Sequence, residues 1–264
     1  MSERVRPQAP AAIRAVLPMT LVFLYLPLVV MVFASFVVKS TDGIGSFTLD
    51  WYRELLHDPV LWAALARSFE VAGVSALVST MLALVSALVL ERWVFVGKWP
   101  LRLLSTASLM LPELVLALSL LSWFSLFKME LNLFTVIIAH VTLTLPFAIL
   151  VIAARLQTLE PSLEEAARDL GASETQVLTR VTLPLMLPGV GAAFVLAFLL
   201  SFDDFLVTFY TNGAGGDTLP VKLYSMMRMG LTPKVQALSS IMLLMSVALV
   251  AVLVRLSGRR DRLN

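Results

Sequence analysis

Long apolar runs, separated by short polar stretches, form the main pattern of this chain. A bilayer core is about 30 Å thick and a helix rises about 1.5 Å per residue, so about 20 uncharged residues in a row can span it. Runs of this kind cover residues 15–38, 71–90, 131–154, 185–202 and 235–254, and a further run covers residues 103–127 with Glu113 inside it. The pattern predicts an all-α, polytopic membrane protein with six transmembrane helices. Because no internal repeat or separate soluble segment interrupts it, we expect one transmembrane domain over residues 1–264.

The composition agrees with a bilayer environment. Hydrophobic residues make up 59% of the chain and charged residues only 14%. Buried helices of a large soluble protein would need amphipathic partners to cover them, and this chain has few such segments. The chain has no cysteine, which excludes disulfides, thiolate metal sites and cysteine catalysis.

The basic residues set the expected orientation, because cytoplasmic segments are enriched in Lys and Arg. With a cytoplasmic N-terminus, the inner segments hold Arg4, Arg6 and Arg14; Arg92, Lys98 and Arg102; Arg155, Arg168 and Arg180; and Arg255, Arg259, Arg260 and Arg262, thirteen of the 20 basic residues. Both termini are then cytoplasmic. The first run is longer than the apolar part of a cleavable signal, which indicates a retained span. Residues 47–65 become external, and their aromatic spacing predicts an amphipathic helix that Asp50 caps.

The cytoplasmic segment between the fourth and fifth runs, residues 155–184, has more local order than a connector needs. Ser162 and Glu165 have the spacing of a capping box that begins a helix, and Gly171 is placed to end that helix in the left-handed conformation. Ser173 and Gln176 form a second capping box, and Pro184 is expected to end the second helix before the fifth span. The first helix has an apolar stripe of Leu163, Ala166, Ala167 and Leu170.

A short helix with a small-residue stripe has no core of its own, so we expect it to dock in a groove of another protein. The alternative is a helix that lies on the membrane surface. Such helices are usually rich in Lys and Arg, whereas this stretch carries Glu160, Glu164, Glu165, Asp169 and Glu174. The charge pattern favours docking.

The same segment resembles the EAA signature of ABC importer permeases. The matching positions are Glu165, Ala166, Ala167, Gly171, Val181, Leu183 and Pro184, with Val181 where Ile is common. The resemblance implies a type I importer core in a bacterial inner membrane, with this loop as the helix that couples to an ATP-binding subunit. It further implies a homologous permease, two copies of the ATP-binding subunit and an external substrate-binding protein as partners, and no cofactor.

The chain itself lacks a phosphate-binding loop. Its only glycine cluster, residues 212–217, has no Gly-Lys-Ser/Thr, so energy is expected to come from the separate ATP-binding partner. Neither a Gly-x-Ser-x-Gly turn nor a paired metal-ligand spacing of His is present, so we expect no enzyme and no metal site. Nothing points to nucleic acid; membrane lipid is the expected surrounding.

Charged residues within the predicted spans are the candidates for cargo contact, because they are costly there. Glu113 follows Pro112 near the expected midplane, where it either contacts cargo or shares a proton with His140. Asp203 and Asp204 interrupt the fifth run near its expected outer end, and they either form a solvated helix end or face the pore. The surrounding aromatic residues are Phe198, Phe202, Phe205, Phe209 and Tyr210. They either form an interfacial belt or help to bind an organic cation.

Residues 201–244 resemble a narrower family, the second permease subunit of putrescine/spermidine transporters. The likeness rests on Ser-Phe-Asp-Asp-Phe at 201–205, on the stretch from Thr218 to Gly230 and on residues 233–238. It implies a polyamine cargo. Ferric iron, thiamine and sulfate importers are alternatives of the same class. A stand-alone channel or secondary carrier is a further alternative, but it predicts no docking helix and often shows an inverted repeat.

Overall fold

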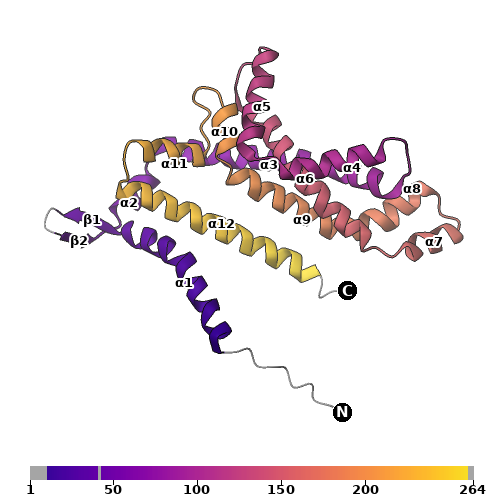
Figure 1. Cartoon of the computed structure of the whole chain (residues 1–264), viewed down its shortest axis with the longest axis horizontal. Helices are drawn as coiled ribbons and strands as arrows, with labels where there is room; N and C mark the ends of the chain where they lie inside the picture. Colours follow the sequence, from indigo (N-terminus) through magenta and orange to yellow (C-terminus); the bar gives the residue numbers. More distant parts are fainter. Residues whose placement is uncertain (1–10, 41–42, 261–264) are drawn as a thin grey trace. The chain divides into compact units, whose positions relative to one another are not determined.

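The computed structural model describes residues 11–40 and 43–260, whose regular secondary structure is helical apart from one two-stranded hairpin (Figure 1). The helices are α1 (Ala11–Ala34), α2 (Asp50–Leu56), α3 (Pro59–Arg92), α4 (Lys98–Ala107), α5 (Glu113–Leu126), α6 (Leu133–Gln157), α7 (Pro161–Asp169), α8 (Glu174–Val177), α9 (Leu183–Phe202), α10 (Leu206–Thr211), α11 (Leu219–Arg228) and α12 (Pro233–Arg260). A 3-10 turn covers Ser108–Met110 and a π-helical segment covers Leu178–Thr182. The predicted all-α class is confirmed.

Five helical stretches in the described residues are long and apolar enough to cross a membrane. They are Val16–Ala34, Pro59–Arg92, Leu133–Gln157, Glu174–Phe202 and Pro233–Ala251. The third predicted span differs, because it is divided into Lys98–Met110 and Glu113–Leu126, which meet at an angle of 112°. Pro112 causes the break: it lacks a backbone donor, and both it and Leu111 have extended backbone angles. If the bent pair is one span, six spans result, as predicted.

By their internal contacts the residues form two compact units. The first unit holds the chain up to Asp58 together with Ser225–Leu244, and the second holds Pro59–Tyr224 together with the chain from Met245 onward. Each unit is described by itself.

The first unit contains the predicted external segment, whose structure differs from the expected single helix. Strands β1 (Val37–Ser40) and β2 (Gly43–Phe47) pair antiparallel, with Val37 opposite Phe47. The helix expected over residues 47–65 is interrupted at residues 57–58, so that α2 is short and α3 begins at Pro59. The prediction of Asp50 as a cap is wrong: Leu49 holds the cap position, and Asp50 is the first helical residue.

Aromatic and ionic contacts hold the first unit together. The ring of Phe36 stacks on Phe47 and on Tyr52, with centroids 5.1 and 5.0 Å apart. The Lys234 ammonium lies 2.7 Å from a carboxylate oxygen of Glu54, so α12 is connected to α2.

The second unit is a helical bundle in which α3, α6 and α9 pack side by side (Figure 1). Its core is rich in small residues, namely Ala83, Ala87, Ala148 and Ala193 around Ile152 and Met186. Small side chains allow helix backbones to approach closely, which is the usual basis of helix packing in membranes. These three helices carry Ser79, His140 and Ser201, which belong to the polar network described below.

The fifth span is longer than predicted, because α8, the π-helical segment and α9 run on without a break from Glu174 to Phe202. The prediction that Pro184 ends a helix is therefore wrong. Pro184 lies in the first turn of α9, directly after the π-helical segment. A π-type turn changes the hydrogen-bond register, which accommodates the missing proline donor inside a continuous helix.

Candidate functional site

A cavity of about 630 Å³ in the second unit brings together the charged residues that the sequence singled out. The broken third span supplies Glu113 at the first turn of α5, and the end of α9 supplies Asp203 and Asp204. The remaining lining residues are Ser108, Leu109, Leu111, Leu116, Thr142, Leu143, Phe147, Leu199, Leu200, Phe205 and Leu206. Three carboxyl groups therefore face a mainly apolar chamber.

Two helix breaks create this geometry. The bend at Pro112 turns α5 away from α4, so that Glu113 begins a new helix beside α6 and α10. The α9 helix ends at Phe202, and α10 begins only at Leu206. Asp203 and Asp204 lie in the gap, where the backbone is free to send neighbouring side chains in different directions.

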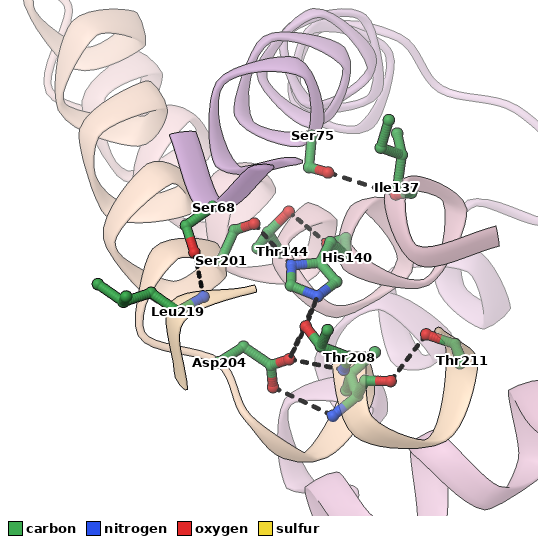
Figure 2. A network of polar contacts seen from close by, with 11 residues as sticks. Ser68, Ser75, Ile137, His140, Thr144, Ser201, Asp204, Thr208, Thr211 and Leu219 are labelled. Carbon is green, nitrogen blue, oxygen red and sulfur yellow. Dashed lines mark hydrogen bonds and ion pairs between the residues drawn. The ribbon is translucent and has the colours of Figure 1, made fainter. Parts of the chain in front are cut away.

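Asp204 is buried, with 4% of its surface exposed, and it contacts His140 of α6 (Figure 2). One Asp204 oxygen lies 3.2 Å from His140 Nε2, and the same oxygen accepts hydrogen bonds from the backbone N–H and the hydroxyl of Thr208, at 2.9 and 3.0 Å. The other oxygen accepts from the backbone N–H of Val207 at 3.3 Å. Asp204 thus provides the acceptor for the first turn of α10, which has no other side-chain cap.

His140 is the centre of this buried network. Its Nδ1 lies 2.6 Å from the hydroxyl of Ser201, and its Nε2 lies 2.8 Å from that of Thr208. Since the Thr208 hydroxyl donates to Asp204, it accepts from Nε2–H, and Ser201 then donates to Nδ1. The network continues to α3, because Thr144 donates to the carbonyl of His140 and lies 2.7 Å from the hydroxyl of Ser79.

Asp203 has a different environment although it is the neighbouring residue. It is exposed and lines the cavity, and its carboxylate accepts a hydrogen bond of 2.9 Å from Ser246. Glu113 is also exposed and lines the same cavity. The described contacts of the His140 ring are to Ser201, Thr208 and Asp204, so Asp204, and not Glu113, is its acidic partner.

The aromatic residues that the sequence grouped together fall into two clusters. Phe205 lines the cavity, and its ring lies 4.6 Å from that of Tyr224 and 5.3 Å from that of Phe209. Phe198 and Phe202 instead contact Phe69 of α3, as part of the bundle. Tyr224 belongs to the cavity cluster but was missed, because no sequence spacing connects it to Phe205.

The loop of residues 155–184 contains two helices, as predicted, but with one different start. The capping box of Ser173 and Gln176 is confirmed. The one expected at Ser162 is wrong: α7 is capped at Glu160 and has Pro161 in its first turn, where a missing donor costs nothing. Gly171 has φ of 86°, which confirms the left-handed end of α7. Its backbone N–H donates to the carbonyl of Arg168.

The EAA positions of this loop divide by exposure. Glu165 and Ala166 are exposed and Ala167 is half-buried, so α7 presents a small-residue surface beside the exposed Leu163 and Leu170. Val181 and Leu183 are half-buried and Pro184 is exposed, where the π-helical segment joins α9.

Glu164 is the loop residue that sequence analysis missed. It is 8% exposed, and one of its oxygens lies 2.7 Å from Arg92 Nη2 and 2.9 Å from the Thr182 hydroxyl. Nothing in the local pattern connects Arg92 to a residue 72 positions further on. On the surface beside it, Arg168 donates to Glu174 at 2.6 Å. This hydrogen bond raises the pKa of the Arg168 guanidinium group.

Within residues 11–40 and 43–260, no group of three or more His, Asp or Glu side chains is arranged to hold a metal ion. The chemistry of the cavity is that of carboxyl groups beside leucine and phenylalanine side chains. Such a site suits an organic cation.

Comparison with known proteins gives consistent results. Residues 79–262 match the family described as binding-protein-dependent transport system inner membrane component. The chain is 36% identical to the spermidine/putrescine transport system permease protein PotC of Escherichia coli (strain K12) over 230 residues, which cover 86% of this chain and 87% of that protein. It is 34% identical to the putrescine transport system permease protein PotI of the same strain, over 84% and 82% of the two chains.

Among solved structures, a chain of a bacterial ABC transporter involved in the import of the acidic polysaccharide alginate has a TM-score of 0.72. The match covers 94% of each chain at 18% sequence identity. This likeness concerns the fold alone.

Proposed function

The chain belongs to the family of binding-protein-dependent transport system inner membrane components, and from that premise we propose that it carries polyamines inward as half of a heterodimeric pore. It is a multi-pass permease subunit of an ABC importer, and it is not an enzyme; ATP is hydrolysed by a separate subunit. In our proposal the other half of the pore is a homologous permease, and an external binding protein delivers the cargo.

The cavity chemistry is the observation that carries the cargo assignment. Glu113, Asp203 and Asp204 line the chamber, and among the described residues that line it none is basic. A protonated polyamine has ammonium groups separated by methylene segments, so it can place charges on the carboxylates and its carbon chain on the leucines. We assign the cargo contacts to Asp203 and Glu113, because Asp204 already has His140 and two backbone donors as partners. The aromatic face of Phe205 is available for a cation–π contact.

The assembly is proposed from the cytoplasmic loop. The exposed surface of α7, with Glu165, Ala166 and Leu163, has the dimensions and chemistry of a helix that docks in a groove, and Gly171 fixes where the helix ends. Ala167 lies on α7 itself, and Val181, Leu183 and Pro184 lie where the π-helical segment, which packs against α7, joins α9. We propose that an ATP-binding subunit holds this surface, with a second copy on the partner permease.

We propose that both termini are cytoplasmic; residues 1–10 and 261–264 lie outside the described residues. The excess of basic residues in the expected inner segments supports cytoplasmic termini. In this orientation α7 and α8 lie on the cytoplasmic side, where ATP is available.

The test is uptake of radiolabelled spermidine and putrescine by vesicles that contain the complete importer with its binding protein and ATP. We expect Asp203→Asn and Glu113→Gln each to lower uptake about tenfold or more, since a charge-assisted contact contributes about 1.5–3 kcal/mol. Glu130→Gln is the matched control, because Glu130 is an exposed acid that does not line the cavity. Wild-type vesicles that accumulate thiamine, ferric iron or sulfate but neither polyamine refute the cargo assignment.

A further inference from the structure

We propose that the partly buried ion pair between Arg92 and Glu164 is the mechanical connection between the ATPase-docking helix α7 and the pore helix α3. This inference rests on the proposed function, since α7 must first contact an ATP-binding subunit. Glu164 and Arg92 are positioning residues in this scheme: they touch neither cargo nor nucleotide.

The neighbouring glutamates Glu164 and Glu165 point to different surroundings. Glu165 is exposed on the docking surface, whereas the Glu164 side chain is 11% exposed and faces the bundle. Consecutive helix positions differ in direction by about 100°, so one can face a partner while the other faces the bundle. The functional part of the docking helix thus includes Glu164, which directly precedes Glu165, the first position of the EAA signature.

Three separate elements meet at Glu164. Arg92 is the last residue of α3, and its guanidinium lies 2.7 Å from Glu164 Oε1. Thr182, which is 3% exposed in the π-helical segment, donates to the same oxygen at 2.9 Å. Arg168, one turn further along α7, lies 3.7 Å from the second oxygen. A carboxylate with these partners holds the end of α3, the docking helix and the start of α9 in one arrangement.

The burial makes this contact stronger than a surface ion pair. The Arg92 side chain is 28% exposed and that of Glu164 11%, so both charges are partly withdrawn from water. Removing one partner leaves the other charge poorly solvated, which is costly. Since α3 packs against α6 and α9, a displacement of α7 that is transmitted to Arg92 reaches α6, which carries His140, and α9, which Asp203 directly follows.

The decisive measurement is a distance that needs no cargo. The chain has no cysteine, so Val85→Cys on α3 and Asp169→Cys on α7 can be spin-labelled specifically. In the complete importer, we expect the distance distribution between the labels to stay narrow in both the nucleotide-free and the ATP–vanadate-trapped states. Glu164→Gln should broaden it in the trapped state, whereas the matched exposed variant Glu160→Gln should not. An unchanged narrow distribution in Glu164→Gln overturns the proposal.

A transport measurement gives the second readout. We expect Glu164→Gln and Arg92→Met each to lower the number of spermidine molecules imported per ATP hydrolysed by about tenfold, because a charge-assisted hydrogen bond contributes about that factor. Arg92→Lys keeps the charge and should retain more coupling than Arg92→Met. The double variant should be no worse than either single variant.

Two results separate this inference from the proposed function. If the wild-type importer carries another cargo, the distance measurement still tests the ion pair. If Glu164→Gln releases the ATP-binding subunit during purification, Glu164 belongs to the docking surface itself and the positioning role is refuted.

Discussion

The structure predicts that two neighbouring aspartates respond in opposite ways to the same substitution. Asp204→Asn should destabilise the protein and Asp203→Asn should not, although both remove one charge. Asp204 is buried and accepts from Val207 N–H and Thr208 N–H while it contacts His140. Asparagine has one acceptor oxygen and one NH2 group in place of the two carboxylate oxygens. Its NH2 group must therefore face a donor, such as the N–H of Val207 or Thr208, that now has no acceptor.

The magnitude follows from these contacts. Loss of one partner of a buried charged contact costs about 3–5 kcal/mol, and we take the lower end because the denatured state in detergent also finds polar partners. A loss of about 3 kcal/mol corresponds to a drop in Tm of about 6–12 °C for a chain of this size. Asp203 is exposed and has Ser246 as its recorded partner, so Asp203→Asn should change the stability by less than about 0.5 kcal/mol.

The assay is thermal unfolding of both variants in detergent, followed by intrinsic tryptophan fluorescence. A double-mutant cycle with His140→Gln measures the coupling energy, which should be close to zero for Asp203 and clearly favourable for Asp204. Equal stability of the two aspartate variants would show that the contacts of Asp204 do not stabilise the protein. The assignment of Asp204 to the fold and of Asp203 to cargo binding would then be wrong.

Three further predictions concern topology and packing. A label at Gly45→Cys should react with an impermeant reagent in intact cells, whereas one at Asn264→Cys should be shielded; reaction of both refutes the orientation. Gly171→Val should reduce binding of the ATP-binding subunit in pull-down assays, because the left-handed conformation costs a β-branched residue about 1 kcal/mol or more. Gly189→Ala should lower thermal stability by about 1–3 kcal/mol, because its new Cβ would lie 2.5 Å from the Arg155 side chain, whereas Gly191→Ala, with open space around it, is the control and should be neutral.

The spans were predictable because their signal is local. A long apolar run is visible in the sequence, and each predicted run overlaps helix in the described residues, although the first run extends beyond α1 into β1 and the third is broken. The bend at Pro112 was only partly predictable. Its proline indicates a weak point, but the 112° angle depends on how α5 packs against α6 and α10.

The sequence predicted which residues form the site but not which of them contact one another. Charged residues inside apolar runs identify Glu113, Asp203 and Asp204 directly. That His140 contacts Asp204 and not Glu113 follows from which faces of α6 and α9 meet, and this is a tertiary property. Likewise, Ser162 and Glu165 have the spacing of a capping box, but α7 begins one residue earlier, at Pro161. Proline fits the first turn of a helix because its backbone nitrogen needs no acceptor there.

The uninterrupted helix from Glu174 to Phe202 can move as one rigid element. Its 29 residues have a length of about 43 Å. If one end is held, a tilt of about 5° moves the other end by about 4 Å, which exceeds the usual hydrogen-bond length of about 3 Å. Asp203 directly follows the last residue of this helix, and α8 forms its first turn. A small rotation of the helix at its α8 end is therefore enough to make or break a contact of Asp203, without any change inside the helix itself.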